Sequence, residues 1–208
     1  TGDETTKGCP LNSYSLQQST SWTDCKCNIG YSGDYRGCAM CLAGLYSISA
    51  NSSMCVSCVP GTYSTGLGQT QASVCISCTP GTYSTTSAAP SSSLCQPCIA
   101  GKYSTAVASN SSLSCTNCVS GKYSLSTSAN SSVVCTLCTE GTYNSDQGAT
   151  QCQSCAAGTF LTVKGANTSL ACVQCGVGKY SSALASSSCA MCGPGTTSNV
   201  SGAASSTS

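Results

Sequence analysis

The sequence predicts a small, disulfide-rich, mainly β protein: an elongated, solenoid-like rod of hairpins that disulfides close in series, without a large core. Two observations lead to this prediction. A C-x-x-C pair recurs nine times at steps of 17 or 20 residues, and 21 of the 208 residues are cysteine. A short fixed period is typical of a repeat protein whose units contact their neighbours. This density of cysteine is typical of a disulfide scaffold, in which cross-links supply order that the Ser-, Thr-, Gly- and Ala-rich spacers cannot supply.

The repeating unit reads C-x-x-C-x-x-G-x-Y-S, and residues 55–64 are its clearest copy. We expect its G-T-Y-S or G-K-Y-S segment to form one strand, because it carries the β-favouring residues. The repeated glycine is expected to supply positive φ or a close backbone approach. The aromatic is expected to pack over the adjacent disulfide and to form the core of its unit. After a polar tip, a second short strand is expected to run into the next cysteine, directly preceded by Met54, Val74, Leu94 or Val134.

The first forty residues differ from the repeats. The stretch from Cys25 to Cys38 reads C-x-C-x-x-G-Y-x-G-x4-C, which resembles the C-terminal half of an epidermal-growth-factor-like module. The resemblance implies a disulfide between Cys27 and Cys38. It also implies a bond from Cys25 to an earlier cysteine, for which Cys9 is the one available.

Two disulfide pairings compete in the repeats. One joins the two cysteines of each C-x-x-C, although such short rings belong mainly to redox sites. The other joins the second cysteine of one pair to the first cysteine of the next. Over residues 41–192, the C-x-x-G-x-[YF] motif with its closing cysteine resembles the first module of tumour necrosis factor receptor repeats and the cysteine-rich repeats of ephrin-receptor ectodomains. The resemblance implies the second pairing: Cys41–Cys55, Cys58–Cys75, Cys78–Cys95, Cys98–Cys115, Cys118–Cys135, Cys138–Cys152, Cys155–Cys172 and Cys175–Cys189.

The complete tumour-necrosis-factor-receptor repeat has a further disulfide that this sequence lacks, so ligand binding by that family does not carry over. The boundaries that follow are a partial growth-factor-like cap over 1–40, tandem repeats over 41–192, and an incomplete ninth repeat or tail over 193–208. This pairing leaves Cys192 without a partner. We expect its partner in a repeat that continues beyond Ser208; the alternative is a free or intermolecular thiol.

The composition argues against several classes of function. Only 6% of residues are charged, the net charge is +1 and histidine is absent. There is accordingly no basic stripe for nucleic acid and no apolar run of membrane-spanning length. The C-x-x-C spacing is close to that of a zinc ribbon, but the missing histidine and the glycosylation sequons favour disulfides, so we expect neither metal nor cofactor. Thiol–disulfide exchange would require a lowered thiol pKa at a helix N-terminus. We therefore expect a non-enzymatic protein.

Five N-x-S sequons indicate a secreted, extracellular glycoprotein. Four of them lie four or five residues before the first cysteine of a C-x-x-C pair, so we expect N-glycans on one class of loop. The sequon asparagines are Asn51, Asn110, Asn130, Asn167 and Asn199.

The function expected from these features is structural. Near-identical units with a bland surface predict a building block of an extracellular filament, cell wall, matrix or surface appendage such as a flagellar hair. Its expected partners are other copies of itself or other extracellular structural proteins. The alternative is the stalk or ligand-binding ectodomain of a cell-surface receptor, adhesin or surface antigen, which would require one repeat with a distinctive apolar or charged face.

Overall fold

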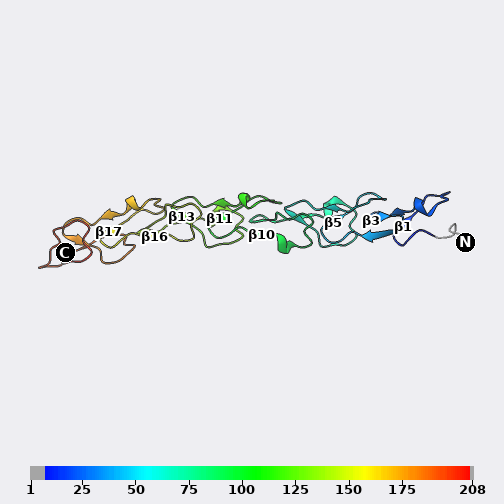
Figure 1. Ribbon diagram of the computed structural model, residues 1–208. Coiled ribbons are helices and arrows are strands. Elements are labelled where there is room, and N and C mark those ends of the chain that lie inside the picture. Colours follow the sequence, from blue (N-terminus) through cyan, green and yellow to red (C-terminus); the bar gives the residue numbers. More distant parts are fainter. Residues whose placement is uncertain (1–7, 207–208) are drawn as a thin grey trace. The chain divides into compact units, whose positions relative to one another are not determined.

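The computed structural model describes residues 8–206, and the chain divides into two compact units. The first unit comprises Thr1–Gln96 and Ala106–Ser114, and the second comprises Pro97–Thr105 and Cys115–Ser208. Residues 8–206 contain no α-helix, only strands of two to four residues and single turns of 3-10 helix (Figure 1). Disulfides close successive hairpins in series, which confirms the predicted fold class of a small disulfide-rich β protein without a large core.

The strands of the first unit form antiparallel hairpins in chain order, as Figure 1 shows from β1 to β5. The pairs are β1 (Ser13–Tyr14) with β2 (Lys26–Cys27), β3 (Tyr31–Asp34) with β4 (Gly37–Met40), β5 (Leu45–Tyr46) with β6 (Val56–Ser57), and β7 (Thr62–Tyr63) with β8 (Ile76–Ser77). Two further strands are β9 (Thr82–Tyr83) and β10 (Gln96–Pro97).

The second unit repeats the same antiparallel pairing. The pairs are β11 (Lys102–Tyr103) with β12 (Thr116–Asn117), β13 (Lys122–Tyr123) with β14 (Thr136–Leu137), β15 (Thr142–Tyr143) with β16 (Gln153–Ser154), β17 (Thr159–Phe160) with β18 (Val173–Gln174), and β19 (Lys179–Tyr180) with β20 (Ala190–Met191).

From β6 onward, the second strand of each paired hairpin consists of the two residues between the cysteines of a C-x-x-C pair. In β8, for example, Ile76 and Ser77 lie between Cys75 and Cys78 and pair with the G-T-Y segment. The expectation of a strand that runs into the first cysteine is therefore wrong. The residues before Cys75 instead form η3 (Ala72–Val74), a 3-10 turn.

These 3-10 turns account for the two repeat lengths. Hairpins whose disulfide spans 17 residues contain a turn before the closing cysteine, whereas no such turn is found in the described hairpins that span 14. The three-residue difference is one 3-10 turn. The remaining turns are η4 (Ser92–Leu94), η5 (Ser112–Ser114), η6 (Ser132–Val134) and η7 (Ser169–Ala171), together with η2 (Trp22–Asp24) before the repeats.

The core of each hairpin consists of the second cysteine and the residue after the aromatic. Cys138 and Asn144 are 0% and 1% exposed, and a serine in most other hairpins takes the place of Asn144 with similar burial. The aromatic is only half-buried; Tyr143, for example, packs against the cluster of Cys155, Leu161 and Ala166. Packing over the adjacent disulfide is thus confirmed at Tyr143, because Cys155 belongs to the Cys155–Cys172 bond. The prediction that the aromatic forms the core of its unit is wrong, because the small residue after it is the buried one.

One buried hydroxyl has no hydrogen-bond partner among the described residues. Ser109 Oγ is buried, whereas most other hairpins have alanine at the equivalent position, as at Ala89 and Ala129. An unsatisfied buried hydroxyl costs about 1–3 kcal/mol. We expect Ser109→Ala to raise the free energy of unfolding by about 1 kcal/mol, measured by guanidinium denaturation. A loss of stability would show that the hydroxyl has a partner.

Candidate functional site: the joint between hairpins

The repeated glycine occupies a tight turn that starts each hairpin. In residues 59–62 the Thr62 N–H donates to the Val59 carbonyl oxygen at 3.1 Å, and the Thr62 hydroxyl donates to the same oxygen at 2.7 Å. Gly61, at the third position of this turn, has φ of 86°. A type II turn requires positive φ there and favours proline before it, as Pro60 provides. The first role predicted for the glycine, positive φ, is confirmed.

Backbone hydrogen bonds from this glycine join each hairpin to the next. The Gly141 N–H donates to the Leu161 carbonyl at 2.8 Å, and the Gly141 carbonyl accepts from the Cys155 N–H at 2.9 Å. In the first unit, Gly44 makes the same two bonds with Ser64 and Cys58, at 2.7 and 2.9 Å. We call this set of contacts the joint.

The tip of the following hairpin completes the joint. The Asn144 N–H donates to the Ala166 carbonyl at 3.0 Å, and the Gly165 N–H donates to the Cys138 carbonyl at 2.8 Å. Tyr143 and Ala166 form a parallel β-bridge at this point. Each joint therefore satisfies backbone groups that short strands leave unpaired.

In addition to the repeated glycine, a second residue in each hairpin has a left-handed backbone conformation. It lies at the tip of the loop between the two strands, and the sequence analysis does not predict it. Ten residues after the second cysteine, φ is positive even where the residue is not glycine, as at Ala88, Ala108, Ser128 and Ala185. The signal was present, because Gly68, Gly148, Gly165 and Gly202 occur at the same offset in the other hairpins.

The joint also reaches across two hairpins. A Cβ on Gly141 would overlap the carbonyl of Ala185, two hairpins further along the chain, and a Cβ on Gly61 would overlap that of Ala108. The second role predicted for the glycine, a close backbone approach, is thereby confirmed. Hairpins are thus interlocked with their next-nearest neighbours within each unit.

The joints begin inside the segment that the sequence assigns to the cap. The Gly30 N–H donates to the Ser47 carbonyl at 3.2 Å, the Gly30 carbonyl accepts from Cys41 at 3.0 Å, and the Cys27 carbonyl accepts from Asn51 at 2.9 Å. These bonds match those of the later joints, so the array starts at Cys27.

Asn144 makes a side-chain hydrogen bond to the preceding hairpin. Its buried Nδ2 donates to the Lys122 carbonyl of the preceding hairpin at 2.9 Å and to the Asp146 carbonyl at 3.0 Å. Asn144 is 1% exposed, so its removal loses these bonds and also leaves a cavity. We expect Asn144→Ala to lower the free energy of unfolding by about 2 kcal/mol, and Asn144→Ser, the residue most common at this position, to cost about 1 kcal/mol. Denaturation of the two variants side by side measures the difference; equal losses would contradict a role for the Lys122 link.

The cysteines pair in series, second cysteine to first cysteine of the next pair. The bonds are Cys9–Cys25, Cys27–Cys38, Cys41–Cys55, Cys58–Cys75, Cys78–Cys95, Cys98–Cys115, Cys118–Cys135, Cys138–Cys152, Cys155–Cys172 and Cys175–Cys189. Within the described residues, Cys192 is free and half-buried, and its N–H donates to the Gly178 carbonyl at 3.0 Å as in the other joints.

The sequon asparagines are all exposed. Asn110, Asn130 and Asn167 share one position, two residues after the left-handed tip residue. Asn51 differs, because it is itself the left-handed residue, with φ of 64°, and Asn199 directly follows buried Ser198. The shared position expected for four sequons therefore holds for three.

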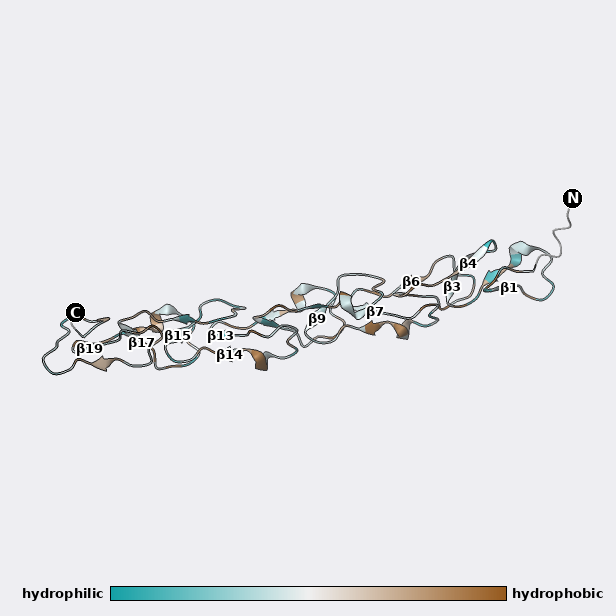
Figure 2. Cartoon of the chain, turned by 90° about the horizontal axis from the view of Figure 1, so that it is seen from below, coloured by the Kyte–Doolittle hydropathy of each residue, from teal (hydrophilic) through white to brown (hydrophobic). Residues whose placement is uncertain are grey.

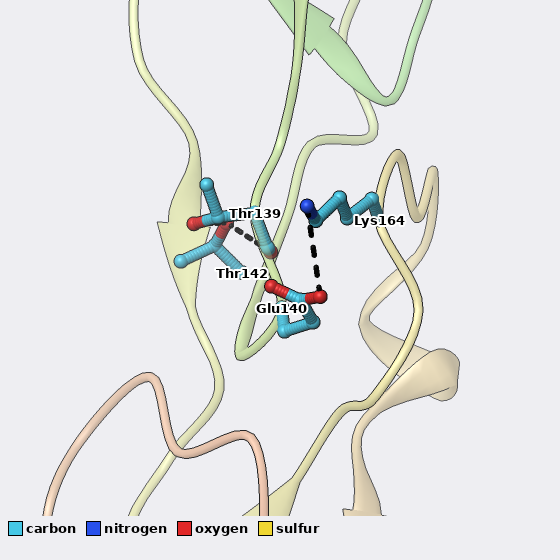
Figure 3. Close-up of polar contacts among 4 residues, drawn as sticks. All are labelled: Thr139, Glu140, Thr142 and Lys164. Carbon is cyan, nitrogen blue, oxygen red and sulfur yellow. Dashed lines mark hydrogen bonds and ion pairs between the residues drawn. The ribbon is translucent and has the colours of Figure 1, made fainter.

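Charged and aromatic side chains contribute little to the joints. Lys164 Nζ lies 3.8 Å from Glu140 Oε1 beside the Thr139–Thr142 turn (Figure 3), but both side chains are exposed, and such pairs contribute little. In the first unit, Trp22 and Tyr35 make an edge-to-face contact with ring centroids 4.8 Å apart.

Residues 8–206 contain no cluster of three or more Cys, Asp or Glu side chains placed to hold a metal ion. Over the same residues, no helix is long and apolar enough to cross a membrane.

Comparison with known families gives a match in the C-terminal part of the chain. Residues 126–170 and 166–208 match the family model described as tyrosine-protein kinase ephrin type A/B receptor-like. This is the cysteine-rich repeat that the C-x-x-C-x-x-G-x-Y-S motif resembles, and the serial disulfides fit it. Over residues 126–208, the ephrin-receptor-like resemblance read from the sequence is thus confirmed. No curated protein matches the chain.

Proposed function

We propose that the chain is a non-enzymatic, extracellular structural array that builds a filament, surface appendage, cell wall or matrix. The observation that carries the proposal is the joint, which uses backbone groups and recurs between disulfide-closed hairpins within each unit. Such a joint depends on few side chains, so the exposed positions can vary while the array keeps its geometry. Its expected partners are further copies of the chain or other extracellular structural proteins.

The disulfides suit an array that bears load. From Cys41 to Cys189, each disulfide closes a loop spanning 14 or 17 residues, so tension passes through the joints without releasing the chain inside the loops. Cross-links of this kind persist in oxidising, extracellular surroundings. An extracellular location is also supported by the ephrin-receptor-like match over residues 126–208.

A receptor stalk or ligand-binding ectodomain is the second candidate, and the same family match favours it. Immunogold labelling of unpermeabilised source cells, with an antibody to the array, distinguishes the two. Gold along regular fibres or wall material, retained after detergent extraction, is the result we expect. Scattered gold on the cell membrane that detergent removes would favour the receptor. Label confined to permeabilised cells would refute both.

A further inference from the structure

Exposed apolar side chains accompany the sequons. Three residues after Asn110, Asn130 and Asn167 the chain has Leu113, Val133 and Leu170, which are 91%, 86% and 89% exposed. Each sits at the middle of a 3-10 turn: η5, η6 or η7. Figure 2 shows the η6 turn beside β14 in brown, as a hydrophobic segment of the ribbon.

Hairpins of the same length without a sequon have serine at this position. The two that contain η3 and η4 have Thr70 and Pro90 in place of the asparagine, and Ser73 and Ser93 in place of the apolar residue. Asparagine and the exposed apolar residue therefore occur together or not at all in these five hairpins.

The local backbone brings the two positions together. Ser131 and Thr168 cap their 3-10 turns by accepting hydrogen bonds from the Val133 and Leu170 N–H groups, at 3.3 and 3.2 Å. The asparagine directly precedes the cap, and the apolar residue is the second residue of the three-residue turn, so one turn of backbone separates the two positions. A sugar attached to the asparagine amide extends further than an amino-acid side chain and can reach the apolar residue three positions along.

We propose that Asn110, Asn130 and Asn167 carry N-glycans whose first N-acetylglucosamine covers Leu113, Val133 and Leu170. The inference rests on the proposed extracellular function. In the reaction, the asparagine Nδ2 bonds the anomeric carbon of an oligosaccharide carried on a lipid pyrophosphate. The bond from that carbon to the pyrophosphate oxygen breaks, the oxygen keeps the electron pair, and the amide releases one proton.

The attachment sites are accessible. All three asparagines are exposed, and within the described part of the chain no hydrogen bond engages their amides. The serines that complete the sequons, Ser112, Ser132 and Ser169, are also exposed. The N-acetyl methyl group and the apolar face of the sugar then shield side chains that serve no other contact in the array.

Asn199 is an internal control. Three residues after it the chain has Gly202, which offers no apolar side chain. A glycan at Asn199 would therefore cover nothing of this kind.

The test uses the full chain secreted from a eukaryotic cell. An amidase that removes whole N-glycans in heavy-oxygen water converts each occupied asparagine to labelled aspartate, which peptide mass spectrometry reads. We expect label at Asn110, Asn130 and Asn167. A secreted chain unlabelled at these positions would overturn the proposal while leaving the extracellular assignment intact. A chain that is retained inside the cell would instead count against the proposed function and, with it, this inference.

Shielding is measured with the dye anilinonaphthalene sulfonate. An endoglycosidase that leaves one N-acetylglucosamine should keep the fluorescence low, and complete removal should raise it several-fold. The rise should be absent in the Leu113→Ser, Val133→Ser, Leu170→Ser triple variant, whose substituted positions are exposed and tolerate serine in other hairpins. It should persist in Asn199→Gln. Equal fluorescence with and without the sugar, or a rise in the triple variant, would overturn the shielding.

Discussion

Replacing Gly141 with alanine is expected to destabilise the chain by about 3–4 kcal/mol. The residue has φ of 79°, where an L side chain costs roughly 1–2 kcal/mol. The new Cβ would also overlap the Ala185 carbonyl two hairpins away, and forced displacement of packed atoms costs about 1–3 kcal/mol more.

Gly178→Ala is the matched control, because φ at Gly178 is 77° but nothing lies within 4 Å of the added Cβ. We expect it to cost only the backbone penalty of roughly 1–2 kcal/mol. Guanidinium denaturation of the two oxidised variants measures the difference. Equal losses would show that the approach across two hairpins contributes nothing.

Deleting one disulfide in the array is the second large perturbation. The double substitution Cys138→Ala with Cys152→Ala opens a loop spanning 14 residues, which should cost about 3 kcal/mol of stability. Cys192→Ala is the control, because this thiol makes no disulfide in the described chain. We expect it to change the unfolding free energy by less than about 0.5 kcal/mol. Thermal or denaturant unfolding of both variants without reductant measures the two losses of stability. A comparable loss of stability in Cys192→Ala would show that Cys192 has a covalent or packing role.

The hairpins and their cross-links were predictable because their determinants are local and periodic. The spacing of cysteine, glycine and aromatic fixes the turn at Gly61 and the strand at Thr62–Tyr63. The second strand was misplaced because Val74 is β-branched and precedes a cysteine, although the chain forms a 3-10 turn there. At that point, satisfaction of backbone groups outweighed the β preference of one residue.

The joints were not predictable in full, because they depend on contacts between hairpins. Alanine and serine do not by themselves indicate positive φ, so the conformation of Ala185 and Ser128 is not evident from their residue types. Only the glycines at the same offset in other repeats indicate it. Hydrophobic size predicts burial of the large aromatic, whereas the structure buries the small residue after it. At the joint, where the backbones of neighbouring hairpins contact each other, the small side chain of Ser47 is fully buried, and the larger tyrosine ring before it is not.

Interlocking across hairpins determines how the array should come apart. Serial loops without contacts would lose order one at a time on reduction. The bonds at Gly141 and Gly165 instead tie each loop to the loops before and after it. Opening of one loop should therefore weaken its neighbours.

Amide hydrogen exchange in the Cys138→Ala, Cys152→Ala variant tests this claim most directly. The reporters are the N–H groups of Gly121 and Ser124, which lie outside the opened loop but donate to the carbonyls of Asn144 and Ala149 inside it, at 2.7 and 3.1 Å. The interlocked array predicts that both amides lose protection, while the Ser47 amide, bonded to Gln69 in the first unit, keeps it. Unchanged protection at Gly121 and Ser124, with exchange confined to residues 138–152, would contradict the joints as the elements that hold the array together.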